Sequence, residues 1–195
     1  MEYELAKEYI VDRLDKELSP SLYYHSLSHT FDVYESATRL ARMENLSTHD
    51  LRLLQTAAFY HDSGMLMTYD GHENASIEIV NEVLPGYNYN NEDIHKINQM
   101  IMATKLPQNA HSKLEKIICD ADLDYLGRDD FFLIAHRLKL EWLERGTKHT
   151  LRQWYEGQIK FLEQHRYFTQ SAKQLRLEKK KQNLKEIWEL FNDNL

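Results

Sequence analysis

The stretch "LRLLQTAAFYHDSGM", residues 51–65, contains both the pattern that decides the fold and a pair of residues that interrupts it. Its apolar residues recur three and four positions apart, which is the spacing of one buried face of an α-helix. His61 falls on the same face as Leu54 and Ala58, so its imidazole is predicted to point into the interior. Asp62 follows directly. Two buried polar side chains are costly unless other groups satisfy them, so this pair is the first candidate for a functional site.

Helical spacing of apolar residues extends along almost the whole chain. Only six glycines and three prolines interrupt 195 residues, and no segments indicate a β-hairpin. The capping box "SKLE" (Ser112–Glu115) and the stop "SP" (Ser19–Pro20) show how helix starts and ends are marked. The sequence predicts an all-α protein of about eight to nine helices, at residues 2–18, 28–44, 47–64, 72–84, from 90 onward, 112–127, 129–145, 148–166 and 169–192. The predicted inward face of the first helix comprises Leu5, Tyr9, Leu14 and Leu18.

Length and composition indicate one soluble domain. Apolar residues are 42% of the 195, enough for one hydrophobic core without disulfides or structural metal. We expect a single domain over residues 1–195, with a central part at 20–127 and C-terminal helices at 128–195 packing on it. No apolar run approaches the roughly 18 residues that a membrane span needs, and the start of the chain does not look like a secretory signal.

One cysteine and a formal net charge of −7 restrict the location and the partners. Cys119 cannot form a disulfide framework, so we expect a reducing cytoplasm. The negative charge argues against nucleic acid polymers and anionic membranes as partners. The basic run "KKK" at 179–181 is expected to be a solvated helix face. The oligomeric state stays open.

Two other predicted helices place a polar residue on a buried face. In "YHSLSHTFDV", residues 24–33, His29 continues the apolar face of its helix. In "CDADLDYLG", residues 119–127, Asp122 lies four residues after Ile118, so its carboxylate is also predicted to point inward. The two helices can therefore bring further ligands to the His-Asp pair.

Together these residues form a candidate metal-binding set of His29, His61, Asp62 and Asp122. Two imidazoles and two carboxylates suit a divalent cation that accepts nitrogen and oxygen ligands, such as Mn²⁺, Fe²⁺, Ni²⁺ or Zn²⁺. A water on such a cation is acidified and ready to attack phosphorus. An ordinary polar network in the core is the alternative. A second dipeptide, His49-Asp50, lies at a polar helix start, where Asp50 is expected to act as a cap.

The order and spacing of the four residues resemble the HD superfamily of metal-dependent phosphohydrolases, whose H…HD…D motif lies on a bundle of helices. The motifs span residues 23–126. The resemblance implies an HD-type helical bundle with one divalent metal ion: Mn, Fe, Ni, Zn or Mg. It also implies a hydrolase that cleaves a phosphate ester of a small molecule, nucleotides included, by attack of metal-activated water. Monoester and diester cleavage both stay open.

The form "YHxxxHxxDV" also resembles the equivalent stretch of cyclic-nucleotide phosphodiesterases, where the first histidine protonates the leaving group and the second binds metal. This resemblance implies that His25 is the general acid and that His29 is the ligand. Asp62 is expected to orient the attacking water in addition to binding metal. His95 and His111 are interpreted as surface residues, which favours a single metal ion.

Four residues near the motif are candidates for substrate binding. His72 and Glu73, in "DGHENAS", follow the HD pair where relatives place polar residues near the substrate or a second metal. Lys105 and Arg128 come just after helix ends, where a cation can hold a substrate phosphate. Exposed helix-end cations are the alternative interpretation of both.

Two aspartates beside Asp122 are candidates for supporting the site. Asp120 and Asp124 are expected either to accept hydrogen bonds from ligand histidines and orient water, or to be solvated near a helix end.

Two other functions fit the same residues. A non-catalytic metal- or nucleotide-binding sensor or regulatory HD domain would keep the ligands and lose turnover. An oxygenase-like relative would hold two irons.

Overall fold

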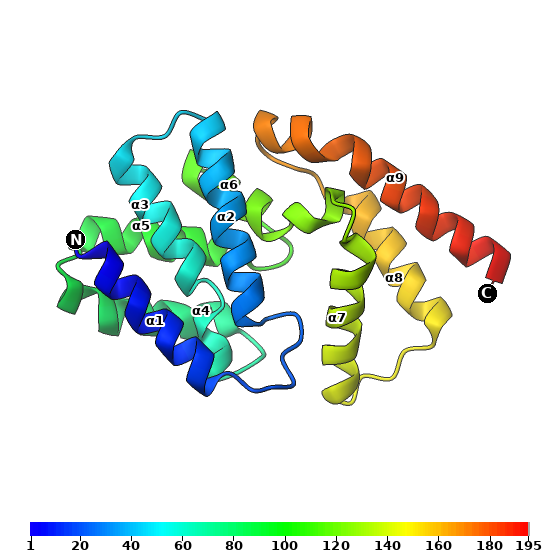
Figure 1. Ribbon diagram of the computed structural model, residues 1–195, viewed down its shortest axis with the longest axis horizontal. Helices are drawn as coiled ribbons and strands as arrows, with labels where there is room; N and C mark the ends of the chain where they lie inside the picture. Colours follow the sequence, from blue (N-terminus) through cyan, green and yellow to red (C-terminus); the bar gives the residue numbers. More distant parts are fainter. Residues whose placement is uncertain (195) are drawn as a thin grey trace. The chain divides into compact units, whose positions relative to one another are not determined.

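The computed structural model describes residues 1–194, and over that range the chain is helical and has no strand (Figure 1). This confirms the predicted all-α fold of eight to nine helices. The nine α-helices of this range are α1 (Tyr3–Glu17), α2 (Leu27–Met43), α3 (Thr48–Tyr60), α4 (His72–Val83), α5 (Asn91–Thr104), α6 (Lys113–Asp122), α7 (Phe131–Glu144), α8 (Leu151–Gln164) and α9 (Gln170–Asn194). Three 3₁₀-helices join them: η1 (Ser63–Leu66), η2 (Leu84–Tyr87) and η3 (Asp124–Gly127). None of the helices described is long and apolar enough to pass through a lipid bilayer.

The chain forms two compact units, Met1–Asp122 and Leu123–Leu195. In the first unit, α3 is the central helix and packs against α1, α2, α5 and α6. Its residues Leu53 and Leu54 are fully buried, as are Ile97 and Ile101 of α5. The periodic apolar faces thus form one core, as their spacing predicts.

The inward face of α1 differs from the prediction. Leu5 is 51% exposed, whereas Ala6 and Ile10 are fully buried. The small Ala6 lets α1 approach α3 closely, and the hydroxyl of Tyr60 donates to the Ala6 carbonyl at 2.8 Å. The close approach of the two helices and this buried hydrogen bond determine which face of α1 is buried. Neither can be predicted from apolar spacing alone.

Two predicted helices end earlier in the structure than the sequence indicates. The third was expected to continue to Gly64, but α3 ends at Tyr60 and η1 follows. The sixth was expected to continue to Gly127, but α6 ends at Asp122 and η3 follows. In both places the polar residue of the motif lies at a helix end, where the backbone can turn the side chain toward a neighbouring element.

The second unit consists of η3, α7, α8 and α9. The carboxylate of Asp124, in η3, receives two hydrogen bonds from the guanidinium of Arg176 in α9, at 2.8 and 2.9 Å. Asn183 lies two helical turns further along α9 and donates to the carbonyls of Leu126 and Arg128. A β-carbon on Gly127 would lie 2.4 Å from the Arg176 carbonyl oxygen, so only glycine permits this close contact. Side-chain bonds and close backbone contact therefore fix η3 on α9.

A buried histidine in the second unit makes its stability sensitive to acid. Burial, helped by the charges of Lys180 and Arg166, lowers the pKa of His165 to about 3. An unfolded histidine titrates near about 6.5. Between these values the unfolded chain binds a proton that the folded chain does not, so the free energy of unfolding should decrease as pH falls from about 6.5 to about 3.

Urea unfolding at pH 7.5 and 4.5 tests this expectation. His165→Leu should lose less stability between the two pH values than the unchanged protein does. His136→Leu, which replaces an exposed histidine of α7, serves as the control and should retain the full acid sensitivity. Equal acid sensitivity of both variants would contradict the assignment to His165.

Candidate metal centre

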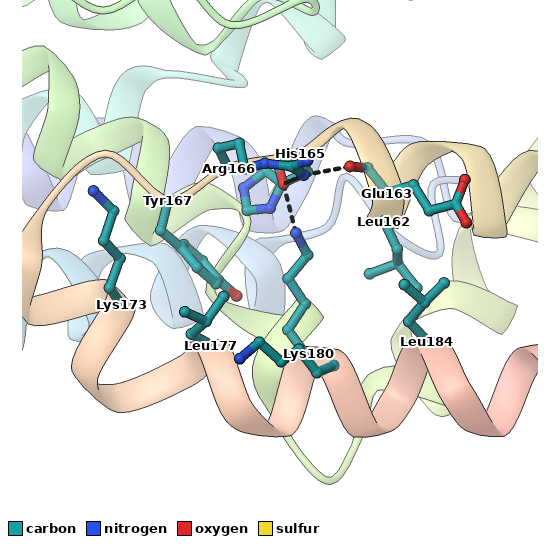
Figure 2. Close-up of a pocket in the computed structure, with 10 residues that line it drawn as sticks. Leu162, Glu163, His165, Arg166, Tyr167, Lys173, Leu177, Lys180 and Leu184 are labelled. Carbon is teal, nitrogen blue, oxygen red and sulfur yellow. Dashed lines mark hydrogen bonds between the residues drawn. The ribbon is translucent and has the colours of Figure 1, made fainter.

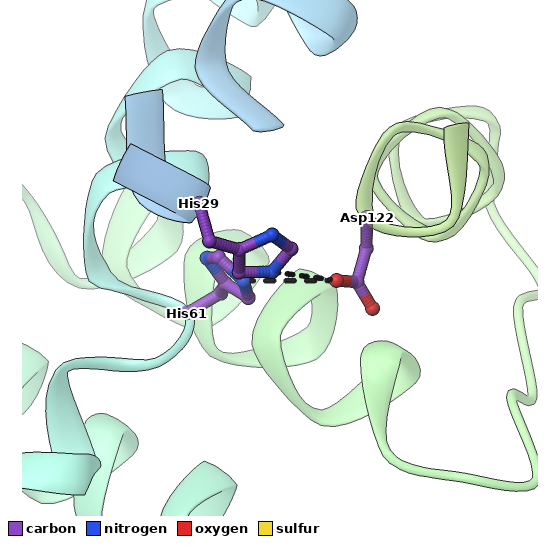
Figure 3. Close-up of side chains that lie close together, drawn as sticks. All are labelled: His29, His61 and Asp122. Atoms are coloured by element: carbon purple, nitrogen blue, oxygen red, sulfur yellow. Dashed lines mark hydrogen bonds and ion pairs between the residues drawn. The ribbon is translucent and has the colours of Figure 1, made fainter. Parts of the chain in front are cut away.

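Side chains from three helices of the first unit meet at one point (Figure 3). His29 comes from the first turn of α2, His61 directly follows α3, and Asp122 ends α6. The Nε2 of His29 lies 3.2 Å from Asp122 Oδ1, and the Nε2 of His61 lies 3.8 Å from the same oxygen. One ligand atom from each of the three residues lies within 4.8 Å of the others. The convergence predicted from helical spacing is present.

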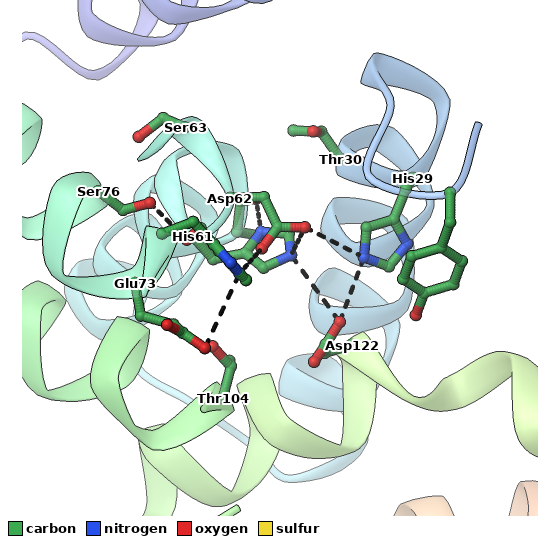
Figure 4. Close-up of polar contacts among 12 residues, drawn as sticks. His29, Thr30, His61, Asp62, Ser63, Glu73, Ser76, Thr104 and Asp122 are labelled. Carbon is green, nitrogen blue, oxygen red and sulfur yellow. Dashed lines mark hydrogen bonds and ion pairs between the residues drawn. The ribbon is translucent and has the colours of Figure 1, made fainter. Parts of the chain in front are cut away.

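Asp62 completes the group from a second side (Figure 4). Its Oδ2 lies 3.1 Å from His61 Nε2 and 3.6 Å from His29 Nε2. Its Oδ1 lies 3.3 Å from Nε2 of His72 at the start of α4. Two imidazole nitrogens and two carboxylates thus face one another in the buried interior of the unit.

The backbone sets which ring nitrogen of His61 faces the centre. Nδ1–H donates to the carbonyl of Ala58, one turn earlier in α3, at 2.9 Å. A neutral imidazole fixed in this way has its lone pair on Nε2, which is the nitrogen directed at the carboxylates. His29 is placed by the helix start, because Ser26 caps α2 by accepting from the His29 backbone N–H.

A single hydroxyl holds the backbone on both sides of Asp62. Ser76 of α4 donates to the His61 carbonyl at 2.7 Å and accepts from the Gly64 N–H at 2.8 Å. Gly64 also lies so close to α4 that a β-carbon there would be 2.0 Å from the His72 carbonyl oxygen. The HD segment is therefore held against α4, a contact that the sequence reasoning missed. The available signal was that Ser76 shares a buried helix face with Ile79 and Val80.

The charges in the centre are strongly coupled. Burial alone would lower the pKa of His61, but the negative charges of Asp62 and Asp122 outweigh it and raise the pKa to about 9. Burial opposes ionisation of Asp62, but the charges of His61, His72 and His25 hold the Asp62 pKa well below its usual value. Asp62 thus stays ionised and attracts a positive charge. A proton or a bound metal ion can supply that charge, and they compete for it.

His72 supports the orientation of Asp62. Its Nδ1–H donates to the Tyr69 carbonyl at 3.0 Å, which leaves Nε2 facing Asp62. Burial favours the neutral ring, but contact with ionised Asp62 outweighs it and raises the pKa of His72. The ion pair through Oδ1 turns the other carboxylate oxygen, Oδ2, toward His29 and His61.

Two buried atoms show that the group suits a cation. His61 Nε2 and Asp62 Oδ2 have no hydrogen-bond partner, although they lie 3.1 Å apart. Buried polar atoms without a partner cost free energy, and a metal ion would satisfy a nitrogen lone pair and a carboxylate oxygen together. His29, His61, Asp62 and Asp122 would hold it, and this donor set fits a divalent cation of mixed nitrogen and oxygen preference.

Other predicted residues surround the centre within the first unit. His25 is half-buried, and its ring centre lies 5.4 Å from that of His72 and 6.3 Å from that of His29. Glu73 is buried, with Oε1 3.8 Å from His72 Nε2. Asp120 is buried in α6, two residues before Asp122.

The remaining predicted residues are exposed or pair with residues outside the group. Lys105 is exposed at the end of α5. Asp124 and Arg128 belong to the second unit, where Asp124 pairs with Arg176, and Arg128 pairs with Asp130 at 2.7 Å. His95 and His111 are exposed, as predicted.

The family model of the HD domain matches residues 26–124, which include all four proposed ligands. The chain therefore belongs to the HD domain family. An uncharacterized protein from Clostridium beijerinckii is 36% identical over 81 residues, which cover 40% of this chain and 51% of that protein. The match thus spans about half the length of this relative.

Solved structures share the fold over nearly the whole chain. A predicted HD superfamily hydrolase from an uncultured Thermotogales bacterium is similar with a TM-score of 0.62 and 19% identity, covering 97% of this chain and 91% of its own. Bacillus subtilis YpgQ, in complex with ADP, gives a TM-score of 0.69 at 20% identity and covers 99% and 97%. A protein from Lactobacillus plantarum gives 0.69 at 18% identity and covers both chains completely. At these identities the likeness concerns the fold.

Proposed function

We propose that this protein is a metal-dependent phosphohydrolase that cleaves a phosphate ester of a small molecule, with nucleotides as the first substrates to test. The observation that carries the proposal is the buried group of His29, His61, Asp62 and Asp122, in which two atoms have no hydrogen-bond partner. Membership of the HD family supports hydrolysis. The ADP complex of the similar B. subtilis protein supports nucleotides.

Each residue around the centre has a chemical role in this proposal. A divalent cation bound there would polarise a phosphoryl oxygen and acidify a coordinated water. Asp62, ionised and oriented by His72, accepts the proton of the attacking water or orients that water. His25, beside the ligands, donates a proton to the departing oxygen. Glu73 borders the space in front of Asp62, where it would accept a hydrogen bond from a substrate hydroxyl.

A cation outside the centre would hold the substrate phosphate. Lys105 has an exposed ammonium group at the end of α5, available as a point charge. Asp120, buried in α6 two residues before Asp122, is proposed to support the ligands through hydrogen bonds.

Metal analysis combined with a substrate panel tests the proposal. Protein stripped with EDTA and reloaded with Mn²⁺, Fe²⁺, Ni²⁺, Zn²⁺ or Mg²⁺ should retain about one ion per chain and release phosphate or a nucleoside phosphate from members of a nucleotide panel. Retention of no cation would contradict the proposal. Tight nucleotide binding without any product would favour a non-catalytic HD domain, and two irons with visible absorption would favour an oxygenase.

The role of His25 can be separated from metal binding. His25→Gln should lower kcat by about 100- to 10,000-fold, because general acid catalysis typically contributes this much. The loss should be much smaller for a 4-nitrophenyl ester, whose leaving group departs without protonation, and metal content should stay unchanged. His95→Gln, at an exposed position of α5, is the matched control. An equal loss for good and poor leaving groups would rule out His25 as the general acid.

A further inference from the structure

The second unit contains a cavity that the metal centre does not use (Figure 2). It has a volume of about 690 Å³ and lies between the last turn of α8, the connection to α9, and α9 itself. Its apolar lining comes from Leu162, Tyr167, Leu177 and Leu184. Ligand sites of this size with a mainly apolar lining are common, and a few polar groups then set which ligand binds.

Three cations at the cavity have no carboxylate partner within residues 1–194. Arg166 donates to the carbonyls of Glu163 and His165, and Lys173 donates to the carbonyl of Phe168 at 3.2 Å. The ammonium of Lys180 donates to the His165 carbonyl at 2.6 Å. The lining also contains Lys181, which pairs with Glu178, and the carboxylate of Glu163, which forms no ion pair with these cations. The lining thus has a clear excess of positive charge.

Two of the lining residues are buried in a way that carries a cost. Lys180 is only 5% exposed, and its ammonium lies 5.8 Å from the Tyr167 ring centre. His165 is 9% exposed, and neither of its ring nitrogens has a hydrogen-bond partner. A buried ammonium without an anion and a buried imidazole without a partner are both unfavourable, and an anion beside them would stabilise the unit.

The electrostatics of the cavity agree with this geometry. Burial and the nearby charge of Arg166 lower the pKa of Lys180 to about 8. A buried ammonium of lowered pKa agrees with the excess of positive charge in the lining, which no carboxylate of residues 1–194 neutralises.

We propose that this cavity binds a small organic anion that carries one carboxylate or phosphate group on an aliphatic body. The head group would contact Arg166, Lys173 and Lys180, and the body would lie on Leu162, Leu177 and Leu184. Charge complementarity selects the anion, and the leucine lining selects the aliphatic body over a compact polar one. This site is separate from the residues of the metal centre and does not depend on the proposed hydrolase activity.

Calorimetric titration of the full chain in EDTA tests the proposal, because removal of metal prevents a phosphate from binding at the metal centre. Decanoate and decyl phosphate below their micellar concentrations should each bind at one saturable site. Inorganic phosphate, which lacks the aliphatic body, should bind at least about tenfold more weakly, because it buries no apolar surface against the leucines. Octyl glucoside, which lacks the charge, should also bind at least about tenfold more weakly, the loss expected for one interaction with a charged group. If inorganic phosphate bound as tightly as decyl phosphate, the proposed ligand class would be wrong. If neither decanoate nor decyl phosphate bound, the proposed site would be wrong.

Matched lysine variants locate the binding. Lys180→Met keeps most of the length of the side chain and removes its charge, and it should lower the affinity for decanoate at least about tenfold. Lys173→Met should also lower that affinity, and because Lys173 is exposed the substitution should leave the fold intact. Lys160→Met, on the exposed face of α8 and outside the cavity lining, should bind decanoate like the unchanged chain. If all three variants bound decanoate with equal affinity, the ligand would lie outside this cavity and the proposal would be refuted.

Discussion

Replacing His61 with alanine is expected to lower the affinity for divalent cations by more than about a hundredfold, and to remove hydrolysis with it. Loss of a residue behind a metal ligand already costs about 10- to 100-fold in affinity, and His61 is itself a proposed ligand. Its Nε2 faces Asp62 and Asp122 at 3.1 and 3.8 Å, so the substitution removes a nitrogen that faces both carboxylates. Elemental analysis after EDTA treatment and reloading measures the effect directly.

The control for this experiment is His95→Ala, which removes an exposed histidine of the same unit. It should leave metal content and turnover unchanged. Circular dichroism and urea unfolding will show whether the His61→Ala chain is folded. A folded His61→Ala protein that retained one ion per chain would contradict the metal centre and the function proposed from it.

Replacing Gly64 with alanine is expected to lower the free energy of unfolding by about 3 kcal/mol or more, the upper end for overpacking a dense core. The added β-carbon would lie 2.0 Å from the His72 carbonyl oxygen and 2.6 Å from the Ser76 backbone nitrogen. Both atoms belong to the backbone of α4, so the helix must move as a whole. Because Ser76 bonds to the His61 carbonyl, metal affinity should fall along with stability.

Gly86→Ala provides the matched comparison for Gly64→Ala. A β-carbon at Gly86 would meet nothing within 4 Å. Gly86 lies in η2. Alanine there should be neutral or should stabilise the protein by about 0.4–1 kcal/mol, because it reduces the conformational freedom of the unfolded chain. Denaturant unfolding of the two variants shows whether the loss of stability comes from the close contact at Gly64 or from any replacement of glycine by alanine. Equal stability of both would refute the close approach of η1 to α4.

Much of the fold and of the metal centre was predictable because helical periodicity determines which residues point inward. His29, His61 and Asp122 each continue an apolar face, and three inward-facing ligands on packed helices have little space in which to stay apart. The exposed position of His95 followed from the same rule, and that of His111 from the polar segment that precedes α6. The ligands whose direction is set by the periodicity of their own helix could therefore be predicted from the sequence.

Contacts between elements were not predictable from local spacing. Asp124 is two residues from Asp122, yet its carboxylate pairs with Arg176, which lies 52 residues further along the chain. No periodic pattern links the two positions. The end of α3 was misjudged for a similar reason, because Gly64 is required by a close contact with α4 and does not mark the end of the helix.

The Ser76 hydroxyl, which joins the His61 carbonyl to the Gly64 N–H, limits how the substrate preference of this protein could be redesigned. The first turn of α4 carries His72 and Glu73, which are proposed to contact the substrate, and the second turn carries Ser76. Any repositioning of the first turn to accept a larger molecule moves the serine too, and with it the carbonyl and amide that flank Asp62. Engineered variants with altered selectivity should therefore arise more readily from substitutions at Lys105, which leave α4 in place, than from changes within that helix.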